Sequence, residues 1–146
     1  LEYLCNEIIE NLNEISETKP VQFHFNFLEP EICQDKTRLK IILNNLLFNA
    51  IKFQKSSPGH KPYVKISSFR NGDDLQIEVE DNGEGIRSEQ LEKIFQMFYR
   101  GHEKASGSGL GLYIAKEATS KINGSISVRS EFGKGSTFVI NFKDLK

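Results

Sequence analysis

The segment IILNNLLFNAIKF, residues 41–53, combines apolar residues at helical spacing with three asparagines and a lysine. Asp35 and Thr37 upstream are N-cap residue types, so the sequence predicts a long helix that runs to about Ser56. At about 100° per residue, its core-facing stripe consists of Leu39, Ile42, Leu43, Leu46, Ala50 and Phe53. Asparagine is a mediocre helix former because its side chain competes for backbone hydrogen bonds. The three asparagines therefore need a reason other than helix formation.

A second, polar stripe lies directly beside the core stripe and consists of Arg38, Asn45, Asn49, Lys52 and Ser56. A polar stripe in this position is either a solvated flank of the helix or one wall of a cleft. In the cleft interpretation, Asn49 offers a neutral carbonyl oxygen to a hard cation such as Mg²⁺. Lys52, one turn later, offers a positive charge to phosphate. Asn44 falls on the far side of the helix, where we assign it no role.

Periodicity and turn residues predict the remaining elements. Further helices are expected over residues 1–17, 88–98 and 110–122. Strands are expected over residues 21–27, 63–69, 75–80, 125–130 and 136–142. Hairpin turns join the second strand to the third and the fourth to the fifth, which implies a mixed, mostly antiparallel sheet. Helices on one face of that sheet would give an α/β fold, a two-layer α/β sandwich, with residues 1–146 as a single domain.

The composition is that of an ordinary globular protein with a formal net charge of −1. This balance gives no general electrostatic case for binding nucleic acid or an anionic membrane. Cys5 and Cys33 lack metal-ligand spacing, and we expect them to be reduced thiols of a cytoplasmic protein. We find neither a signal peptide nor a long apolar span, so we expect a soluble piece. The chain begins at Leu1 without a methionine, which suggests a fragment of a longer protein.

Two glycine-bearing segments are candidates for ligand contact. EVEDNGEGI, residues 78–86, would be a hairpin, but the residues after it are helical and a second strand is missing. Asp81 therefore ends a strand and is followed by a turn whose glycines allow a ligand to approach the backbone closely. A carboxylate at a strand end can accept a hydrogen bond from an exocyclic amine such as that of adenine.

The second such segment is SGSGLGLYIAKEA, residues 106–118, whose alternating glycines lead into a helix. Such a loop suits phosphate, because unpaired N–H groups and the helix dipole face the anion. Two better-known phosphate motifs are excluded. The dinucleotide fingerprint requires glycine where Leu112 stands, and a P-loop requires serine or threonine where Gly135 stands.

Five motifs, in their order along the chain, resemble those of the catalytic ATP-binding domain of sensor histidine kinases. This domain belongs to the Bergerat-fold (GHKL) group, with type II topoisomerases, Hsp90 chaperones and MutL repair proteins. The motifs are an asparagine box (35–53), a first glycine box (81–86), a phenylalanine box (95–98), a second glycine box (107–112) and a closing strand motif (133–138). The resemblance covers essentially Leu1 to Lys146. It implies the Bergerat fold, with ATP and Mg²⁺ as ligands, and it implies that Phe95 and Phe98 anchor the base of a lid by packing.

The resemblance also implies roles at the purine end of the nucleotide. Asp81 would bind the adenine amino group. Ser136, or its neighbour Thr137, would support Asp81 through a water, and Phe53 would line the pocket near the adenine or ribose. The same wall would be formed by Gly83, Gly85 and Ile86.

At the phosphate end, the resemblance implies that Asn49 coordinates Mg²⁺ between the phosphates, with Asn45 assisting. Lys52 would contact phosphate. Residues 98–108 would form a mobile lid, from which Arg100 would reach the γ-phosphate. Further nucleotide contacts are implied for Gly107, Gly109, Leu110 and Gly111.

The function implied is the ATP-binding catalytic module of a two-component sensor histidine kinase, a protein-histidine kinase. Such a module presents the γ-phosphate of Mg–ATP to a histidine on a separate dimerisation domain. His24, His60 and His102 all lack the sequence context of the phosphoacceptor, so we expect that histidine and the sensor to lie outside this chain. The expected partners are ATP, the phosphoacceptor domain of the same protein and a response regulator. We expect a monomeric fragment, a homodimeric full-length protein and a cytoplasmic location, with the membrane status of the parent protein undecided.

Three other functions stay open: an ATP-hydrolysing clamp, a serine-directed anti-sigma kinase and a nucleotide sensor without catalysis. Hydrolysing relatives carry a glutamate one turn before the metal-binding asparagine, where this sequence has Asn45. An amide cannot act as that general base. The short lid and the long asparagine box favour a histidine kinase over an anti-sigma kinase.

Overall fold

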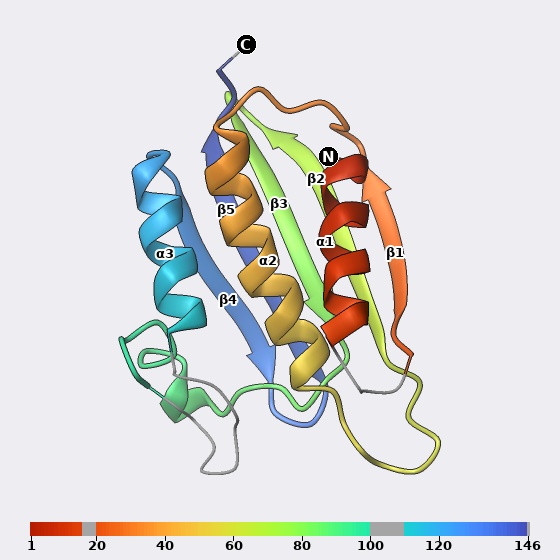
Figure 1. Ribbon diagram of the computed structural model, residues 1–146. Coiled ribbons are helices and arrows are strands. Elements are labelled where there is room, and N and C mark those ends of the chain that lie inside the picture. The colour runs from red at the N-terminus through yellow and green to blue at the C-terminus, as the bar shows by residue number, and fades with distance from the viewer. Residues whose placement is uncertain (16–19, 100–109, 146) are drawn as a thin grey trace.

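The computed structural model describes residues 1–15, 20–99 and 110–145. Its α-helices are α1 (Glu2–Ile15), α2 (Lys36–Lys52) and α3 (Gly111–Lys121), and its strands are β1 (Gln22–Phe27), β2 (Tyr63–Asn71), β3 (Asp74–Asp81), β4 (Ser125–Glu131) and β5 (Gly135–Lys143). The helices cover one face of the sheet, with α2 between α1 and α3 (Figure 1). The predicted two-layer α/β sandwich is confirmed.

The strands form one sheet in the order β1-β2-β3-β5-β4. β1 runs parallel to β2, and the other pairs are antiparallel, so the sheet is mixed and mostly antiparallel as predicted. The register aligns Val64, Asp81, Ser136 and Ser130 across neighbouring strands. Cross-strand partners place their side chains on the same face of a sheet. Because Val64 is buried in the core under the helices, the whole row lies on the helix-covered face.

Helix α2 begins where the sequence predicts and buries a wider surface than the predicted stripe. Asp35 is its N-cap, and the Asp35 carboxylate accepts a hydrogen bond from the backbone N–H of Arg38 at 3.1 Å. The predicted core positions as far as Ala50 are buried, and Leu47 and Ile51 are buried as well. The buried face is wide because α2 packs on the sheet and also contacts α1 and α3.

The C-terminal end of α2 lies at Lys52, four residues before the predicted end at Ser56. The backbone N–H of Phe53 still bonds the carbonyl of Asn49, at 3.2 Å, but the Phe53 carbonyl accepts the N–H of Glu84 at 2.9 Å. The first glycine box therefore takes over the carbonyl that a longer helix would use. Phe53, assigned to the core stripe by its spacing, is only half-buried at this junction.

The helix predicted over residues 88–98 is wrong. Only a short 3-10 helix, Ser88–Gln90, is present, and the next backbone N–H groups bond carbonyls three residues earlier, as 3-10 turns do. Ile94 is buried and Phe95 packs edge-on against Phe138, with ring centroids 6.2 Å apart. The segment thus packs on the core through Ile94 and Phe95 as a series of turns rather than as a continuous helix. Phe98 was expected to pack at the lid base, but it is 65% exposed.

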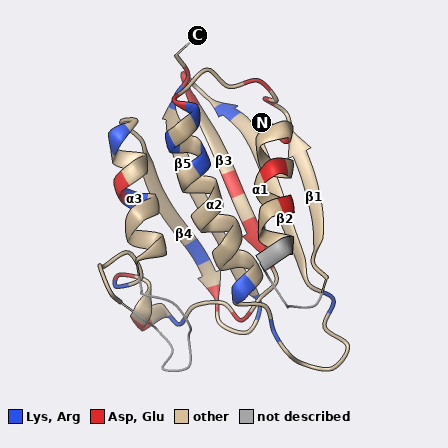
Figure 2. Ribbon diagram, viewed as in Figure 1, with Lys and Arg blue, Asp and Glu red and all other residues tan. Residues whose placement is uncertain are grey.

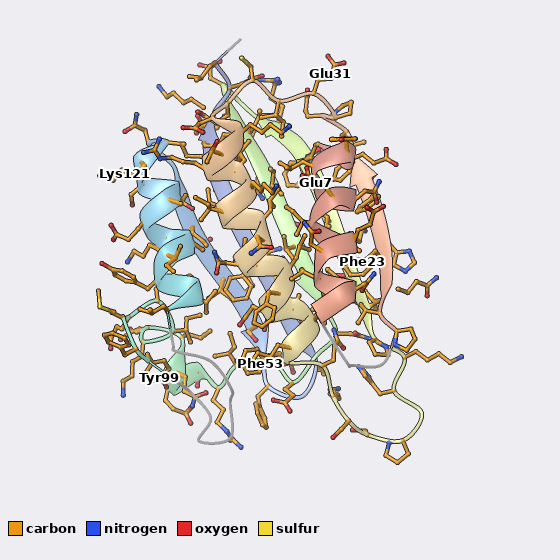
Figure 3. All side chains as sticks on the ribbon, viewed as in Figure 1. Glu7, Phe23, Glu31, Phe53, Tyr99 and Lys121 are labelled. Carbon is orange, nitrogen blue, oxygen red and sulfur yellow. The ribbon has the colours of Figure 1, made fainter. Side chains whose placement is uncertain are left out.

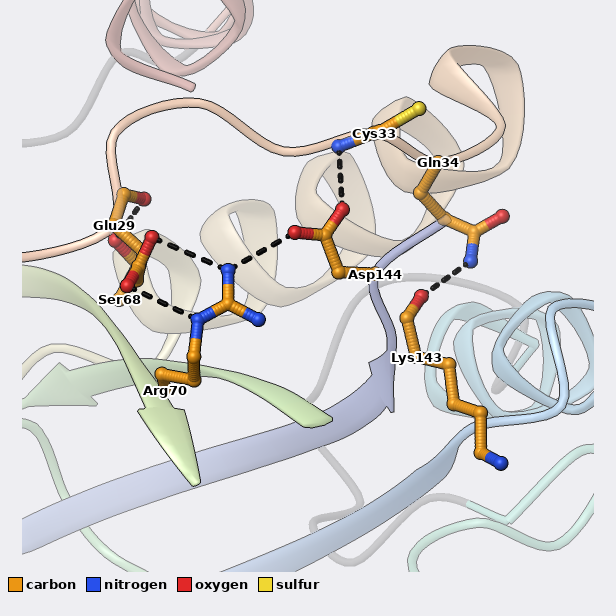
Figure 4. Close-up of polar contacts among 7 residues, drawn as sticks. All are labelled: Glu29, Cys33, Gln34, Ser68, Arg70, Lys143 and Asp144. Carbon is orange, nitrogen blue, oxygen red and sulfur yellow. Dashed lines mark hydrogen bonds and ion pairs between the residues drawn. The ribbon is translucent and has the colours of Figure 1, made fainter. Parts of the chain in front are cut away.

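A polar cluster joins three segments at the end of the sheet where β5 finishes; we call it the C-terminal clasp and define it as Glu29, Cys33, Arg70 and Asp144 (Figure 4). Arg70 donates to Glu29 at 3.2 Å and to Asp144 at 3.0 Å. Asp144 also accepts the backbone N–H of Cys33 at 3.1 Å. The clasp fixes the segment before α2 to the end of β5. Cys33 and the buried Cys5 are free thiols.

Candidate functional site

Three segments meet at the end of the molecule away from the clasp: the C-terminus of α2, the turn after β3 and the N-terminus of α3 (Figure 1). Figure 3 places Phe53 and Tyr99 at this end. The basic residues of α2 lie towards its two ends, and Lys52 is the one in the last turn (Figure 2). Most of the residues predicted to bind nucleotide lie on these three segments.

Asn45 on α2 faces the start of α3. The Asn45 amide nitrogen donates to the carbonyl of Ile41 at 2.8 Å. Its carbonyl oxygen points toward α3, because a methyl group built on Gly111 would lie 3.3 Å from Asn45 Oδ1. Asn49 lies one turn further along the same flank and is half-buried, whereas Asn44 is exposed. Amide oxygens beside a helix N-terminus fit a magnesium ion that is bound to phosphate groups.

Lys52 lies beside aromatic rings at the C-terminal end of α2. Its ammonium nitrogen is 5.2 Å from the centroid of the Phe53 ring and 5.9 Å from that of Phe48. Contact with the ring faces favours a cation at this position. A positive charge therefore lies on the same end of α2 as Asn49.

Asp81 is a buried carboxylate at the end of β3, with 8% of its surface exposed. Burial raises the pKa of its carboxyl group to about 6, although hydrogen bonds from the backbone N–H groups of Gly83 and Ser136 lower this pKa and the charge of Glu80 raises it further. The Gly83 N–H lies 2.9 Å from the carboxylate. Burying a carboxylate is costly unless a partner is supplied, so this group is suited to a ligand that donates a hydrogen bond.

Two glycines bring the turn after β3 close to its neighbours. A methyl group on Gly83 would lie 2.4 Å from the Phe53 carbonyl oxygen, and one on Gly85 would lie 2.2 Å from the Glu131 carbonyl oxygen. Gly85 also has a φ of +74°, a conformation that favours glycine. The turn is therefore fixed between the end of α2 and the hairpin of β4 and β5.

The sheet register distinguishes the two candidate partners of Asp81. Ser136 is the direct cross-strand partner of Asp81, whereas Thr137 pairs with Glu80 and lies on the opposite face. Sequence reasoning missed Ser130, which pairs with Ser136 and whose hydroxyl is 2.8 Å from the Ser136 hydroxyl. The sequence feature that could have identified Ser130 is its position opposite Ser136 across the short β4–β5 turn.

The structure describes some of the other residues predicted to contact nucleotide and leaves others outside its described ranges. Ile86 is half-buried against the core, and its N–H donates to Ser130 Oγ at 2.7 Å. Leu110 precedes α3 and Gly111 is its first residue. Arg100, with Gly107 and Gly109, lies outside the described residues, as do His102 and most of the predicted lid.

A buried carboxylate at the end of a central strand thus lies at the same end of the sheet as the polar flank of α2 and the N-terminus of α3. The chain belongs to the family described as histidine kinase-, DNA gyrase B-, and HSP90-like ATPase, which matches residues 34–146.

Curated relatives within this family are bacterial sensor proteins. The chain is 37% identical over 141 residues to the aerobic respiration control sensor protein ArcB of Escherichia coli, a match that covers 90% of this chain and 18% of ArcB. It is 33% identical over 142 residues to the sensor histidine kinase ZraS of Escherichia coli, covering 96% of this chain and 29% of ZraS. The chain thus spans less than a third of the length of either relative.

Solved structures agree with this fold. The catalytic domain of histidine kinase ThkA, in a nucleotide-free form, superposes with a TM-score of 0.79 at 26% identity, covering 98% of this chain and 93% of that one. Full-length ShkA in complex with AMPPNP gives a TM-score of 0.80 at 25% identity, covering 98% of this chain and 30% of ShkA.

Proposed function

We propose that this chain is the ATP-binding catalytic module of a two-component sensor histidine kinase. It binds Mg–ATP and presents the γ-phosphate to a histidine on a separate dimerisation and phosphoacceptor domain. The observation that carries this proposal is Asp81, a buried carboxylate that, among the described residues, is held by the backbone N–H groups of Gly83 and Ser136 and meets no cation. The likeness to ZraS and the AMPPNP complex of the structurally similar ShkA support it.

At the purine end, Asp81 accepts a hydrogen bond from the adenine amino group, and Ser136 rather than Thr137 supports it, since Ser136 shares its face. Phe53 covers the adenine or ribose. Gly83, Gly85 and Ile86 form the adjoining wall.

At the phosphate end, Asn49 and Asn45 hold Mg²⁺, whose charge neutralises the phosphate oxygens during transfer. Lys52 supplies a further positive charge. The N-terminus of α3, with Leu110 and Gly111, offers backbone N–H groups to phosphate. Within the same proposal, Arg100 from the lid contacts the γ-phosphate, and Gly107 and Gly109 contribute loop N–H groups.

The module transfers phosphate and does not hydrolyse ATP efficiently, because the position that would hold a general base is Asn45, whose amide cannot take a proton from water. Catalysis then depends on placing an external nucleophile in line with the γ-phosphate. His24 lies on strand β1 and His60 lies in the loop between α2 and β2, so neither lies on a helix. The acceptor therefore belongs to a partner domain.

The partners we propose are the phosphoacceptor domain of the same protein and a response regulator, with a monomeric module inside a homodimeric parent. We place the module in the cytoplasm. None of the described helices is both long and apolar enough to cross a membrane. Charges of both signs are dispersed over the described ribbon (Figure 2), and we propose no nucleic-acid or membrane contact for this module.

Substitution of Asp81 tests this function directly. A hydrogen bond to a charged group contributes about 1.5–3 kcal/mol, so Asp81→Asn should weaken ATP binding by about ten- to a hundredfold. The matched control is Glu80→Gln, the neighbouring carboxylate on the opposite face, which should leave ATP affinity unchanged. Calorimetric titration with ATP and Mg²⁺ measures both. Equal ATP affinity in folded Asp81→Asn protein and in the unaltered chain would refute the adenine assignment.

A further inference from the structure

A row of three polar side chains crosses the sheet beneath the proposed purine site. Ser130 on β4, Ser136 on β5 and Asp81 on β3 are successive cross-strand partners, so their side chains share the helix-covered face. Ser136 is 7% exposed and Asp81 is 8% exposed. The hydroxyl groups of Ser130 and Ser136 have a limited choice of partners in this row, so their protons can be assigned.

The Ser130 hydroxyl makes three contacts, and they determine where its proton goes. The backbone N–H of Ile86 donates to Ser130 Oγ at 2.7 Å. Ser130 Oγ donates to the carbonyl oxygen of Gly135 at 2.9 Å, a group that can only accept. Ser130 has a single hydroxyl proton, and this contact uses it. The remaining contact, 2.8 Å to Ser136 Oγ, must then be made with the proton of Ser136.

We propose that Ser130 is a positioning residue for purine selection. It accepts a hydrogen bond from the Ser136 hydroxyl, so Ser136 Oγ faces the nucleotide only as a hydrogen-bond acceptor beside Asp81. This inference rests on the proposed function. The purine edge then meets two acceptors, a carboxylate and a hydroxyl oxygen, directly or through a water that donates. Adenine offers an amino group to this edge. Hypoxanthine offers a carbonyl oxygen at the same place and meets acceptors alone.

Loss of the Ser130 hydroxyl changes this arrangement without removing any group that touches nucleotide. In Ser130→Ala, the Ser136 proton loses its partner and is free to turn toward the purine, where it can donate to a carbonyl oxygen. Inosine triphosphate should gain affinity relative to ATP. The loss of selectivity should be about five- to tenfold, the scale of one neutral hydrogen bond.

The experiment is a titration of ATP and inosine triphosphate, each with Mg²⁺, into the unaltered chain and its variants. Ser130→Thr keeps the hydroxyl and should keep the ATP preference. Ser127→Ala, an exposed serine on the same strand, is the matched control and should also keep it. In a Ser136→Ala background, Ser130→Ala should change the preference no further, because the hydroxyl through which it acts is gone.

Equal weakening of both nucleotides in Ser130→Ala, with the preference unchanged, would overturn the inference and leave a structural role. A shift that persists in the Ser136→Ala background would also overturn it. If Ser130→Ala does not fold, Ser130→Cys replaces it, because a thiol is a weaker donor and acceptor than a hydroxyl. Ser130→Cys should lower the preference for ATP over inosine triphosphate partway, and an unchanged preference would contradict the inference. Failure of the unaltered chain to bind ATP would overturn the proposed function itself, an outcome distinct from normal ATP binding with an unmoved preference.

Discussion

Asp81 and Asp144 are carboxylates buried at opposite ends of one sheet, and they are held in different ways. The side chain of Asp144 is 4% exposed and faces the guanidinium of Arg70 and a backbone N–H group. Asp81 is similarly buried, but among the described residues its carboxylate meets backbone N–H groups and no cation. In the part of the chain that the structure describes, Asp144 is paired with a cation and Asp81 has no counter-charge.

This difference indicates which end serves structure and which serves binding. A buried charge that is paired joins segments, as the C-terminal clasp joins three. A buried charge without a counter-charge raises the free energy of the folded state, which a protein tolerates most often at a functional site.

The largest expected effect is on the phosphate side of the site. Asn49→Ala removes a proposed Mg²⁺ ligand, and the Mg²⁺ dependence of ATP affinity should fall about tenfold or more, as when a charged group loses a hydrogen bond. Titration with and without Mg²⁺ measures this. Asn44→Ala, on the exposed side of the same helix, is the control and should retain the full Mg²⁺ dependence. Similar losses in both variants, or a collapse of the melting temperature in Asn49→Ala alone, would favour a structural role for this asparagine.

The pKa of Asp81 predicts how ATP binding depends on pH. Because the pKa is raised to about 6, the carboxylate is charged above that pH and becomes protonated below it. Adenine needs the charged acceptor, so ATP affinity should be constant above pH 7 and fall by up to about tenfold per pH unit below 6. A phosphate group titrates near the same pH, so the readout is the difference between the unaltered chain and Asp81→Asn. Parallel pH profiles for the two proteins would contradict the assignment.

The same carboxylate should lower the stability of the nucleotide-free protein. Its folded-state pKa of about 6 lies above the ordinary 3.8, so stability is greatest at low pH and falls as pH rises between these values. The gap corresponds to at most about 3 kcal/mol. Asp81→Asn should therefore raise the free energy of unfolding at pH 7.5 by about 1–3 kcal/mol, and the gain should vanish near pH 4. Urea titration at both pH values measures it, and destabilisation by Asp81→Asn at pH 7.5 would be the contrary result.

The smallest effect is expected at the clasp. Arg70→Ala leaves Asp144 without its guanidinium, but Arg70 is partly exposed, so the free energy of unfolding should fall only modestly. ATP affinity should not change, because the clasp lies at the other end of the sheet. Arg129→Ala, which breaks an exposed ion pair with Glu78, is the control and should cost less. A large change in ATP affinity in Arg70→Ala would show that the two ends are coupled.

The sequence predicts well what depends on local periodicity. The core stripe and polar flank of α2, and the strand that ends at Asp81, follow from helical and alternating spacing and are present. Contacts between distant segments could not be predicted in this way. Ser136 is distinguished from Thr137, and Ser130 becomes visible, only through the register of β3, β5 and β4.

The same limit explains the errors at the ends of elements. Helix α2 ends at Lys52 because the backbone N–H of Glu84, in the turn after β3, bonds the Phe53 carbonyl. Helical propensity cannot predict a contact with so distant a segment. The segment after residue 87 has helix-forming residues and packs Ile94 and Phe95 inward, yet it folds as a short 3-10 helix followed by turns. At the end of α2, a tertiary contact overrode local preference.

The most direct test of the central claim follows the γ-phosphate. Residues 1–146 are incubated with γ-labelled ATP and Mg²⁺, alone or with the helical phosphoacceptor domain of the parent protein, and with Asn49→Ala as the negative control. We predict that the chain alone releases little phosphate, because Asn45 supplies no base, and that the added domain acquires an acid-labile phosphohistidine. Rapid, steady hydrolysis by residues 1–146 alone, abolished in Asn49→Ala, would contradict the account and favour an ATP-hydrolysing clamp.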